Sequence, residues 1–357
     1  MPRLDLSASA ASITQALCDI PSVSGDERRI ADEIMAQLAD LPHLHVHRDG
    51  DTIVARTDRG LPQRVVIAGH IDTVPINDNV PTRLLDQDGE PYLWGRGTVD
   101  MKGGVAVQLK LAAELSDPRV DLTWMWYDHE EVDASLNGLN RLSRTRPDLF
   151  AGDFAILGEP SNGRVEGGCN GNLRVIARTH GVRAHSARAW VGENAIHAAS
   201  PILVRLAEYR PREIPVEGLR YREGLNAVRI SGGIAGNVIP DLCEVEINYR
   251  FAPDKSADAA EAHVRDVLAG FEVEVVDRAE GARPGLDAPL AQEFLAAVGG
   301  EPRPKYGWTD VARFSALGIP AVNYGPGDPS LAHHDQERVP LAQIEDVERG
   351  LRTWLTR

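Results

Sequence analysis

The sequence predicts an α/β protein in which a mixed-sheet domain, with helices on both faces, is interrupted by a smaller ferredoxin-like α+β domain. Between residues 64 and 157, apolar runs of strand length alternate with helical patterns, as in parallel sheets covered by helices. Between residues 173 and 276, the predicted order is strand, helix, strand, strand, helix, strand, which is the ferredoxin-like unit. A chain of 357 residues is also too long for one ordinary core.

The first third of the chain is expected to supply most of the larger sheet. Apolar residues recur at helical spacing in two early segments, and D-G-D at 49–51 indicates a hairpin between two short strands. The runs R-V-V-I-A-G and L-T-W-M-W-Y are almost wholly apolar, which is typical of buried parallel strands. The predicted elements are helices 7–20, 26–41 and 105–115 and strands 44–48, 52–57, 64–69, 121–127 and 154–157.

The middle of the chain has a different pattern. The alternation E-V-E-I-N-Y-R indicates a strand with one buried face. The predicted elements are strands 173–180, 227–231, 243–251 and 271–276 and helices 195–209 and 257–268. Helix 290–298 and strand 321–324 then resume the first pattern. We therefore expect residues 1–172 and 286–357 to form the larger domain, and residues 173–285 to form the inserted one.

Composition excludes several classes of function. A hydrophobic content of 43% with 25% charged residues is ordinary for a globular protein. The net charge of −15 argues against binding to nucleic acid or to an anionic membrane surface. Three widely spaced cysteines form no disulfide framework, and the N-terminus has no apolar signal region. No apolar run is long enough to span a bilayer. These observations predict a cytoplasmic protein that acts on a small molecule.

Acidic and histidine side chains recur where predicted strands end. Ligands of open α/β sheets gather at the carboxyl ends of the strands. The groups at these positions, together with one aspartate in the glycine-rich stretch W-G-R-G-T-V-D-M-K-G-G, are His70, Asp72, Asp100, Glu130, Glu131, Glu159 and His333 or His334. Histidines and carboxylates without a thiolate suit zinc, cobalt or manganese. The set is too large for one ion, and it fits two ions about 3.5 Å apart that share a carboxylate and a water.

Other interpretations of these residues remain open at this point. The glycine-rich stretch matches neither the Walker nor the dinucleotide-binding pattern, and alone it is equally a turn with a surface aspartate. Adjacent glutamates can belong to a solvated turn, and buried ones to ion pairs. His43, His45 and His47 alternate and so share one strand face, but no acidic ligand sits beside them, which favours a polar strand face.

Five motifs in combination resemble one family. They are G-H-I-D-T-V-P at 69–75, G-R-G-T-V-D-M-K-G-G at 95–104, E-E at 130–131, G-E-P at 158–160 and the late histidine. Together they resemble the aminoacylase/glutamate carboxypeptidase family of dinuclear zinc hydrolases, and the likeness covers the whole chain. The resemblance implies two Zn²⁺ ions (or Co²⁺ or Mn²⁺) per chain and hydrolysis of an amide between a short acyl group and an amino acid.

The resemblance also implies a role for each residue of the site. Asp100 would bridge the metals, and the peptide bond after it is expected to be cis. The remaining expected ligands are His70 and Glu159 for one metal and Glu131 and His333 for the other. The pattern H-x-x-x-E, which ends at Glu337, selects His333 over His334. Asp72 would orient His70 through its far nitrogen, and Glu130 would be the general base.

The inserted domain would act as a lid and a dimerisation domain. The resemblance implies that His185 stabilises the oxyanion, across a subunit boundary in a homodimer, and that Asn237, Arg250 and Thr309 bind substrate. We expected an unpaired edge strand, such as 173–180, to mediate the pairing. Three further arginines are weaker candidates for substrate binding: Arg174, Arg183 and Arg313.

Two departures from the resemblance affect substrate recognition and leave the metal ligands intact. The loop G-G-C-N-G-N at 167–172 lacks arginines found in one branch of the family. In addition, Asp310 follows Thr309 directly, whereas many family members place this acid one residue later. Alternatives therefore include other N-acyl amino acid amidohydrolases, peptidases of the same family, a dinuclear phosphoesterase, and a catalytically dead binding module. The last would have lost Glu130 or Asp100, and both are present.

Overall fold

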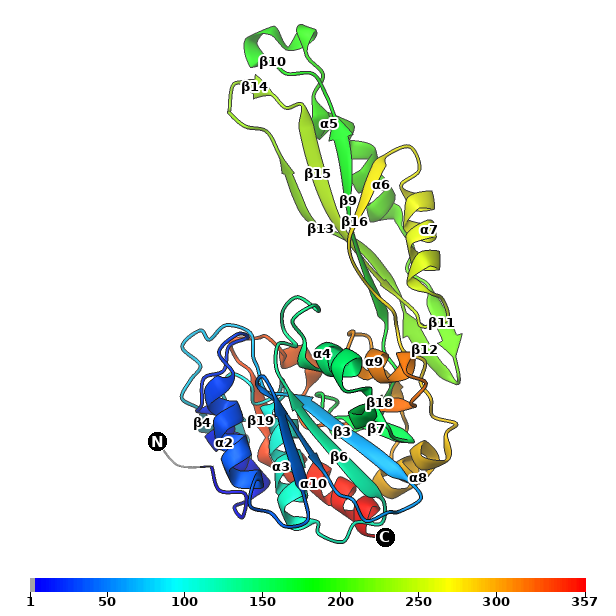
Figure 1. Cartoon of the computed structure of the whole chain (residues 1–357). Helices are drawn as coiled ribbons and strands as arrows, with labels where there is room; N and C mark the ends of the chain where they lie inside the picture. Colours follow the sequence, from blue (N-terminus) through cyan, green and yellow to red (C-terminus); the bar gives the residue numbers. More distant parts are fainter. Residues whose placement is uncertain (1–3) are drawn as a thin grey trace. The chain divides into compact units, whose positions relative to one another are not determined.

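The computed structural model describes residues 4–357 and contains two compact units (Figure 1). The first unit consists of the residues up to Gly167 together with Pro284–Arg303 and Thr309–Arg357. The second consists of Gly168–Arg283 with Pro304–Trp308. The second unit is therefore an insertion into the first.

The first unit is built on an eight-stranded mixed sheet with the order β1-β2-β6-β3-β7-β18-β8-β17. Its four central strands, β6, β3, β7 and β18, are parallel to one another, whereas β2 and β8 flank them in antiparallel pairs. The strands are β1 (His45–Asp49), β2 (Thr52–Arg56), β3 (Arg64–His70), β6 (Asp121–Tyr127), β7 (Phe154–Leu157), β8 (Glu166–Gly167), β17 (Arg303–Pro304) and β18 (Ala321–Asn323). The carboxyl ends of the parallel strands thus meet at one edge.

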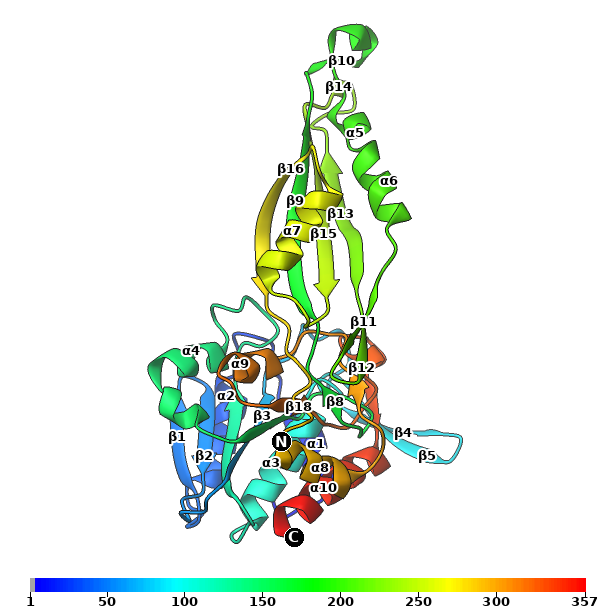
Figure 2. The same ribbon diagram turned by 90° about the vertical axis from the view of Figure 1, so that its right-hand side faces the viewer.

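Helices cover both faces of this sheet (Figure 2). Phe154 of β7 points toward one helical layer, where its ring contacts Phe294 and Trp354. On the other face α9 packs against β7 and β18. The helices are α1 (Ala10–Cys18), α2 (Arg28–Leu38), α3 (Lys102–Glu114), α4 (Gly138–Thr145), α8 (Pro289–Val298), α9 (Val311–Ala316) and α10 (Leu341–Thr356), with short 3₁₀ turns η1 (Pro147–Phe150) and η3 (Pro329–Leu331).

A small three-stranded sheet, which the sequence pattern did not predict, lies beside this unit's site. It has the order β19-β5-β4, from β4 (Arg83–Gln87), β5 (Glu90–Trp94) and β19 (Arg338–Pro340). Asp88 and Gly89 both have positive φ in the two-residue turn between β4 and β5, which is the conformation of a tight hairpin. Because β19 pairs with β5, the chain after His333 returns to the glycine-rich loop that follows β5.

The second unit has the ferredoxin-like topology that the sequence predicts. Its sheet has the order β13-β15-β9-β16, all antiparallel. The main elements are β9 (Gly171–His180), α5 (Ala195–Ala198), α6 (Ser200–Glu208), β13 (Gly224–Gly232), β15 (Leu242–Phe251), α7 (Ala257–Val267) and β16 (Glu272–Ala279). Smaller pieces are β10 (Ala184–His185), η2 (Ser186–Val191), β11 (Glu213–Val216), β12 (Leu219–Arg222) and β14 (Val238–Ile239).

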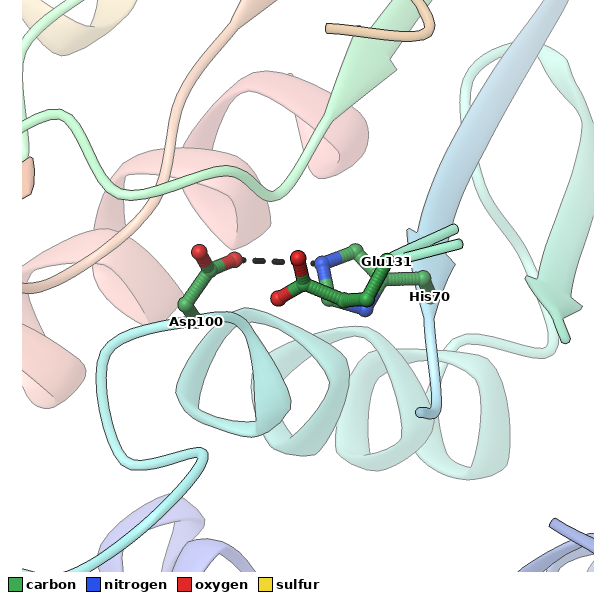
Figure 3. A group of neighbouring side chains, drawn as sticks. All are labelled: His70, Asp100 and Glu131. Carbon is green, nitrogen blue, oxygen red and sulfur yellow. Dashed lines mark hydrogen bonds and ion pairs between the residues drawn. The ribbon is translucent and has the colours of Figure 1, made fainter. Parts of the chain in front are cut away.

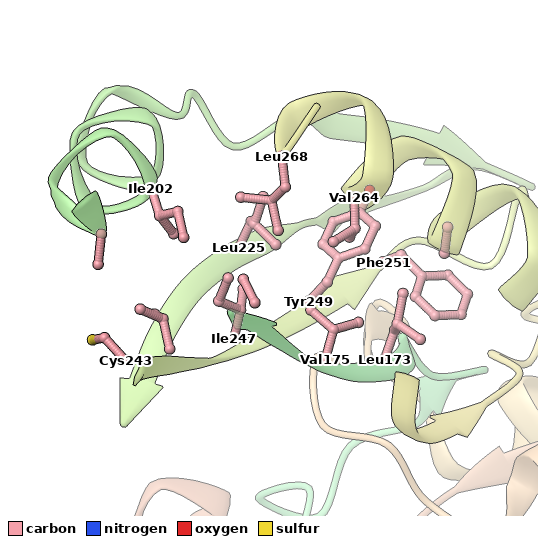
Figure 4. Packing of buried hydrophobic residues seen from close by; sticks show 14 of the residues in the cluster. Leu173, Val175, Ile202, Leu225, Cys243, Ile247, Tyr249, Phe251, Val264 and Leu268 are labelled. Carbon is pink, nitrogen blue, oxygen red and sulfur yellow. The ribbon is translucent and has the colours of Figure 1, made fainter. Parts of the chain in front are cut away.

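One face of this sheet packs against its helices. Alternate residues of β9 and β15 are buried there with apolar residues of α6 and α7 (Figure 4). Val175, Ile247 and Tyr249 are 0–1% exposed in this core. Burial of each such side chain contributes roughly 1.5–3 kcal/mol, so the second unit has a core of its own.

Four details of the prediction are wrong. The strand expected to be an unpaired edge, 173–180, lies within β9, which pairs with β15 on one side and β16 on the other. The edges are β13 and β16. The single helix predicted at 195–209 is the two helices α5 and α6. His43 precedes β1 and so does not share a strand face with His45 and His47. The helix predicted at 26–41 is shorter, because α2 spans Arg28–Leu38 and its N-cap is Glu27.

Within residues 4–357, no helix is both long and apolar enough to cross a membrane.

Candidate metal centre

The groups predicted at strand ends lie at the edge where the parallel strands terminate. Asp100 differs in origin, because it belongs to the glycine-rich loop between β5 and α3. Parallel strands end at the same edge of a sheet, so residues that follow them are brought together. The predicted site residues at or just beyond these strand ends are His70, Asp72, Glu130, Glu131 and Glu159, whereas His333 follows the later turn η3.

Three of the predicted ligands converge in space (Figure 3). Nε2 of His70 lies 3.1 Å from Oδ1 of Asp100. His70, Asp100 and Glu131 each offer one ligand atom, and these three atoms lie within 4.8 Å of one another. Nε2 of His333 lies 3.3 Å from Oδ2 of Asp100 and 3.0 Å from Oε2 of Glu131. Asp100 thus presents one oxygen to each histidine.

The charges of this cluster are strongly coupled. Burial alone would raise the pKa of Asp100, but His333 and His70 hold that pKa well below its usual range. Burial would lower the pKa of His70, but hydrogen bonds with Asp100 and Asp72 raise it well above its usual value. Hydrogen bonds with Asp100 and Glu131 raise the pKa of His333 to about 10. The cluster therefore favours positive charge at its centre.

The donor set fits divalent cations. Imidazole nitrogens and carboxylate oxygens, without a thiolate, are the ligands of mixed N/O sites for zinc, cobalt or manganese. All three cysteines are buried free thiols outside the cluster. In the part of the chain that the structure describes, His70, Asp100 and Glu131 are the one group of three or more such side chains close enough to share an ion.

Of the two late histidines, His333 faces the cluster. It adopts a left-handed backbone conformation with φ of +64°, and its side chain is 55% exposed beside Glu131. Nδ1 of His334 instead accepts the N–H of Gln336 at 3.0 Å. The geometry is therefore consistent with the expected ligand.

The loop that carries Asp100 is held by a buried carboxylate. Oε1 of Glu337, which is 0% exposed, accepts the N–H groups of Val99 (2.9 Å) and Asp100 (3.0 Å). Its Oε2 pairs with Nη1 of Arg96 at 2.7 Å. The Asp100–Met101 peptide bond is cis, as expected. Glu337 thus fixes the main chain of Asp100 rather than binding the cluster itself.

Asp72 holds the main chain of the glutamate pair. Its Oδ1 accepts the N–H of Glu130 and its Oδ2 the N–H of Glu131, both at 3.1 Å, while Oγ of Ser24 donates to Oδ2 at 2.6 Å. Nδ1 of His70 lies 3.0 Å from the carbonyl oxygen of Asp72 and 3.5 Å from Oδ1. A proton on Nδ1 leaves the lone pair of Nε2, beside Asp100, available to bind a cation.

Glu130, the predicted general base, has a carboxyl with a raised pKa. Burial raises the pKa of its carboxyl well above the usual value. The charge of His70 opposes this shift, whereas Asp310, Glu159 and Glu131 raise the pKa further. A carboxylate whose pKa moves toward neutrality accepts and returns protons efficiently near neutral pH.

Other predicted residues of this unit lie deeper. Glu159 is 5% exposed at the end of β7 but is not part of the three-residue group above. Thr309 is buried and its hydroxyl donates to Oδ1 of Asn323 at 2.9 Å. Asp310 accepts Nδ2 of Asn137 at 3.0 Å and pairs with Arg313.

In the second unit, His185 and Asn237 lie together. His185 ends β10, and Asn237 immediately precedes β14, which pairs with β10. The N–H of Ser186 donates to the carbonyl oxygen of Asn237 at 2.9 Å. Nδ1 of His185 accepts the N–H of Ala187 at 3.1 Å. This bond places the proton of a neutral ring on Nε2, so exposed His185 can donate a hydrogen bond outward.

The predicted arginines of this unit differ in environment. Arg250 lies near the end of β15, and burial lowers its pKa. Arg174 and Arg183 form ion pairs at the surface, Arg174 with Glu246 at 3.5 Å and Arg183 with Asp241 at 2.9 Å. Arg250 is thus the most buried of the three side chains predicted to bind substrate anions.

Comparison with known families decides the assignment. The pattern of peptidase family M20/M25/M40 matches residues 66–356, which contain the whole cluster. The chain belongs to this family. As a member of family M20/M25/M40 it is a metal-dependent hydrolase, as the sequence predicted.

Two relatives in family M20/M25/M40 match almost the full length of the chain. One is a proposed succinyl-diaminopimelate desuccinylase of Mycobacterium tuberculosis, 52% identical over 99% of both chains. The other is the succinyl-diaminopimelate desuccinylase of Corynebacterium glutamicum, 49% identical over 99% of this chain and 98% of the relative. The stretches E-G-L-N-A-V-R-I-S-G-G-I-A-G-N-V-I-P, I-N-Y-R-F-A-P and K-Y-G-W-T-D-V-A-R-F predict the same resemblance, to desuccinylases of the actinobacterial type, and this prediction is confirmed.

Solved structures share the fold of this chain. A tripeptidase of Staphylococcus aureus superposes with a TM-score of 0.77 at 20% identity, covering 99% of this chain and 98% of that one. A dinuclear metal-binding peptidase of Bacillus subtilis gives a TM-score of 0.72 at 16% identity, covering 97% and 96%. The predicted mixed α/β fold is confirmed.

Sequence analysis missed side chains that support this M20/M25/M40 site from a distance. Glu27 and Ser24 precede the first strand, and Arg96 lies in the glycine-rich loop. Each is held by a partner far away in sequence, as Arg96 is by Glu337. The G-D-E at 25–27 is ordinary helix-start sequence, so no signal in the pattern could have found Glu27.

Proposed function

We propose that this enzyme removes the succinyl group from N-succinyl-LL-2,6-diaminopimelate by hydrolysis of its amide bond, a step of lysine and diaminopimelate biosynthesis. The observation that carries the proposal is the 52% and 49% identity to two desuccinylases over nearly the whole chain. The cluster of His70, Asp100, Glu131 and His333 supports it, because it supplies donors for divalent cations. We expect the enzyme to act in the cytoplasm.

Six side chains would organise two Zn²⁺, Co²⁺ or Mn²⁺ ions in this proposal. Asp100 would bridge them, and Asp72 would orient His70. The expected ligands beside Asp100 are His70 with Glu159 for one ion and Glu131 with His333 for the other. When bound, the ions would supply positive charge that lowers the pKa of a water molecule and polarises the amide carbonyl.

The protein's own groups would move the protons. Glu130 accepts a proton as water attacks the carbonyl carbon, and it delivers that proton to the nitrogen as the C–N bond breaks, which releases succinate and the free amine. Nε2–H of His185 donates a hydrogen bond to the carbonyl oxygen as negative charge develops there. The raised pKa of Glu130 supports the first role, and the tautomer of His185 supports the second.

Fixed cations and amides would select a substrate with three carboxylates. Arg250 and Asn237 are assigned to this role, with Thr309 in the first unit. A guanidinium that burial already deprives of water gains more from a carboxylate than an exposed one. N-Acetylornithine deacetylation is the alternative, because the loop 167–172 lacks arginines.

We further propose a homodimer in which the second unit, acting as a lid, lends His185 to the partner's site. One exposed edge of its sheet, β13, carries Val228 and Ile230, which are 58% and 48% exposed. Beside it α6 exposes Leu203 and Val204. An edge strand with free main-chain groups and neighbouring apolar side chains favours pairing with a second copy.

A substrate panel tests the proposed function. Metal-loaded enzyme is assayed for amine release from N-succinyl-diaminopimelate and from N-acetylornithine. The expected result is a kcat/KM at least tenfold higher, roughly, for the succinyl substrate, since its extra carboxylates engage fixed cations. A preference for N-acetylornithine would assign the chain to the deacetylases, and hydrolysis of phosphoesters alone would refute the amidohydrolase.

A further inference from the structure

Glu27 directs its carboxylate away from its own helix. It occupies the N-cap of α2, where a side chain usually accepts an N–H of the first turn, yet it makes no capping bond. Its Oε2 accepts the N–H of Gly25 at 2.9 Å, and its Oε1 accepts the N–H of His129 at 3.2 Å. The side chain is 0% exposed. A buried carboxylate thus serves a loop about a hundred residues later in the chain rather than the helix that it begins.

His129 forms the turn of the main chain directly before Glu130 and Glu131. Strand β6 ends at Tyr127, and His129 has a φ of +58°, in the left-handed region that is disfavoured for residues with a Cβ atom. Nδ1 of its ring lies 2.7 Å from Oδ2 of Asp128. Asp128 is in turn held by Arg141 and Thr52. Contacts from several elements therefore maintain this conformation.

Two buried carboxylates accept three consecutive amides. Glu27 accepts the N–H of His129, and Asp72 accepts those of Glu130 and Glu131. Both carboxylates are 0% exposed. Placing two like charges in the interior is unfavourable unless each is fully hydrogen-bonded. Here the hydrogen bonds go to one short stretch of main chain, which fixes the orientation of its peptide planes.

The segment that leads into Glu27 pairs with the segment that carries Asp72. The N–H of Ser24 donates to the carbonyl oxygen of Thr73 at 3.1 Å, and the N–H of Thr73 donates to that of Ser22 at 2.9 Å. Oγ of Ser24 also donates to Asp72 at 2.6 Å. Residues 22–25 therefore run alongside 71–73, and the positions of Glu27 and Asp72 are coupled through this pairing.

We propose that Glu27 is a positioning residue for the glutamate pair: by holding the amide of His129, it keeps that residue in the left-handed conformation that aims Glu130 and Glu131 at the metal centre. The roles of Glu130 as general base and of Glu131 as metal ligand rest on the proposed function. Without Glu27 the turn can relax toward right-handed conformations, which rotates the next peptide and displaces both side chains. Removal of Glu27 should therefore impair the catalytic geometry rather than substrate binding.

The test combines kinetics with hydrogen exchange. In Glu27→Ala, kcat should fall at least tenfold while KM changes less than twofold, because a displaced base acts on the transition state. Exchange of the amides in 128–131 should become at least tenfold faster in the same variant. Glu223→Gln is the matched control, since Glu223 is a buried glutamate of the second unit that also accepts a main-chain N–H. It should change neither quantity, even where it lowers the melting temperature.

A second pair of variants tests the backbone directly. Asn adopts the left-handed conformation readily, whereas a β-branched residue does not. His129→Asn should therefore keep at least fivefold more kcat than His129→Val. Equal kcat values for the two would overturn the proposal, and so would a Glu27→Ala enzyme with kcat within twofold of wild type or with unchanged exchange in 128–131. If the wild-type enzyme cleaves no succinyl substrate, the proposed function fails, but the exchange measurement still decides the role of Glu27.

Discussion

Mixing two inactive variants tests whether His185 serves the partner's site. Within the second unit, Leu242 of β15 pairs with His180 and Arg250 pairs with Asn172. The eight residue steps from one pair to the other span about 26 Å of strand. His185 lies beyond the His180 end, so a substrate at Arg250 cannot also contact His185 of the same lid.

The activity expected of the mixture follows from the fraction of active sites that are intact. Equal amounts of His185→Ala and Glu130→Gln protomers that exchange at random give mixed dimers as about half of the population. If His185 acts on the partner's site, each mixed dimer has one site with an intact Glu130 and an intact His185. About a quarter of wild-type activity should therefore return. His185→Ala alone should lower kcat far more than KM, as expected for a group that acts on the transition state.

The assay follows amine release after the two variants are denatured together and refolded, or incubated until they exchange. Mass spectrometry of differently tagged protomers shows how many mixed dimers form. Activity near a quarter of wild type supports the shared site. No activity, in a sample where mixed dimers are demonstrated, would refute it, because an intact His185 in the same chain as Glu130→Gln cannot then rescue the partner.

Three other perturbations give separate expectations. Glu130→Gln should lower kcat by roughly 10²–10⁴-fold with normal metal content, whereas Glu131→Gln should weaken metal binding. Metal analysis of the two variants distinguishes these effects. An inactive Glu131→Gln enzyme with its full metal content would reverse the assigned roles. Arg250→Ala should reduce kcat/KM more for N-succinyl-diaminopimelate than for N-acetylornithine, and equal losses would contradict its role. Burial alone would raise the pKa of Glu223, but hydrogen bonds with Lys255 and a main-chain amide hold it below its usual 4.5. Its contribution to stability is therefore present above that pH and is lost as the pH falls through the lower folded value. The melting temperature of Glu223→Gln should approach that of wild type on acidification, and a constant difference from pH 7 to 3 would be inconsistent with this.

The parallel strands were predictable because their sequence signal is local. The runs 64–69 and 122–127 are almost wholly apolar and are followed by polar residues, so both their positions and the edge they share follow from pattern alone. The hairpin at 83–94 was not predictable in this way. Its first strand is exposed along its whole length and has no apolar period, and its turn is recognisable only from two residues, Asp88 and Gly89.

Strand order in the second unit shows the limit of such patterns. The segment 173–180 was correctly expected to be a strand, but its alternation gives no information about how many neighbours it has. In the structure it is central because β15 and β16 pair with it on both sides. An edge position depends on long-range pairing, which the spacing of apolar residues does not encode.

The candidate metal ligands could be predicted from the sequence, but the residues that position them could not. His70, Asp100 and Glu131 lie in recognisable motifs and do meet in space. Glu337 was noted only as a spacing partner of His333, yet its hydrogen bonds go to the main chain of Asp100. Interactions between a side chain and a distant main-chain amide leave no residue pattern, so they become visible only in three dimensions.

Metal titration tests the dinuclear centre most directly. Metal-free enzyme, prepared with a chelator, is titrated with Zn²⁺ while bound metal and amine release from N-succinyl-diaminopimelate are measured on the same samples. A centre bridged by Asp100 predicts that activity is absent without metal and reaches its maximum at two bound ions per chain. Full activity with at most one bound ion, or activity that survives complete metal removal, would contradict it.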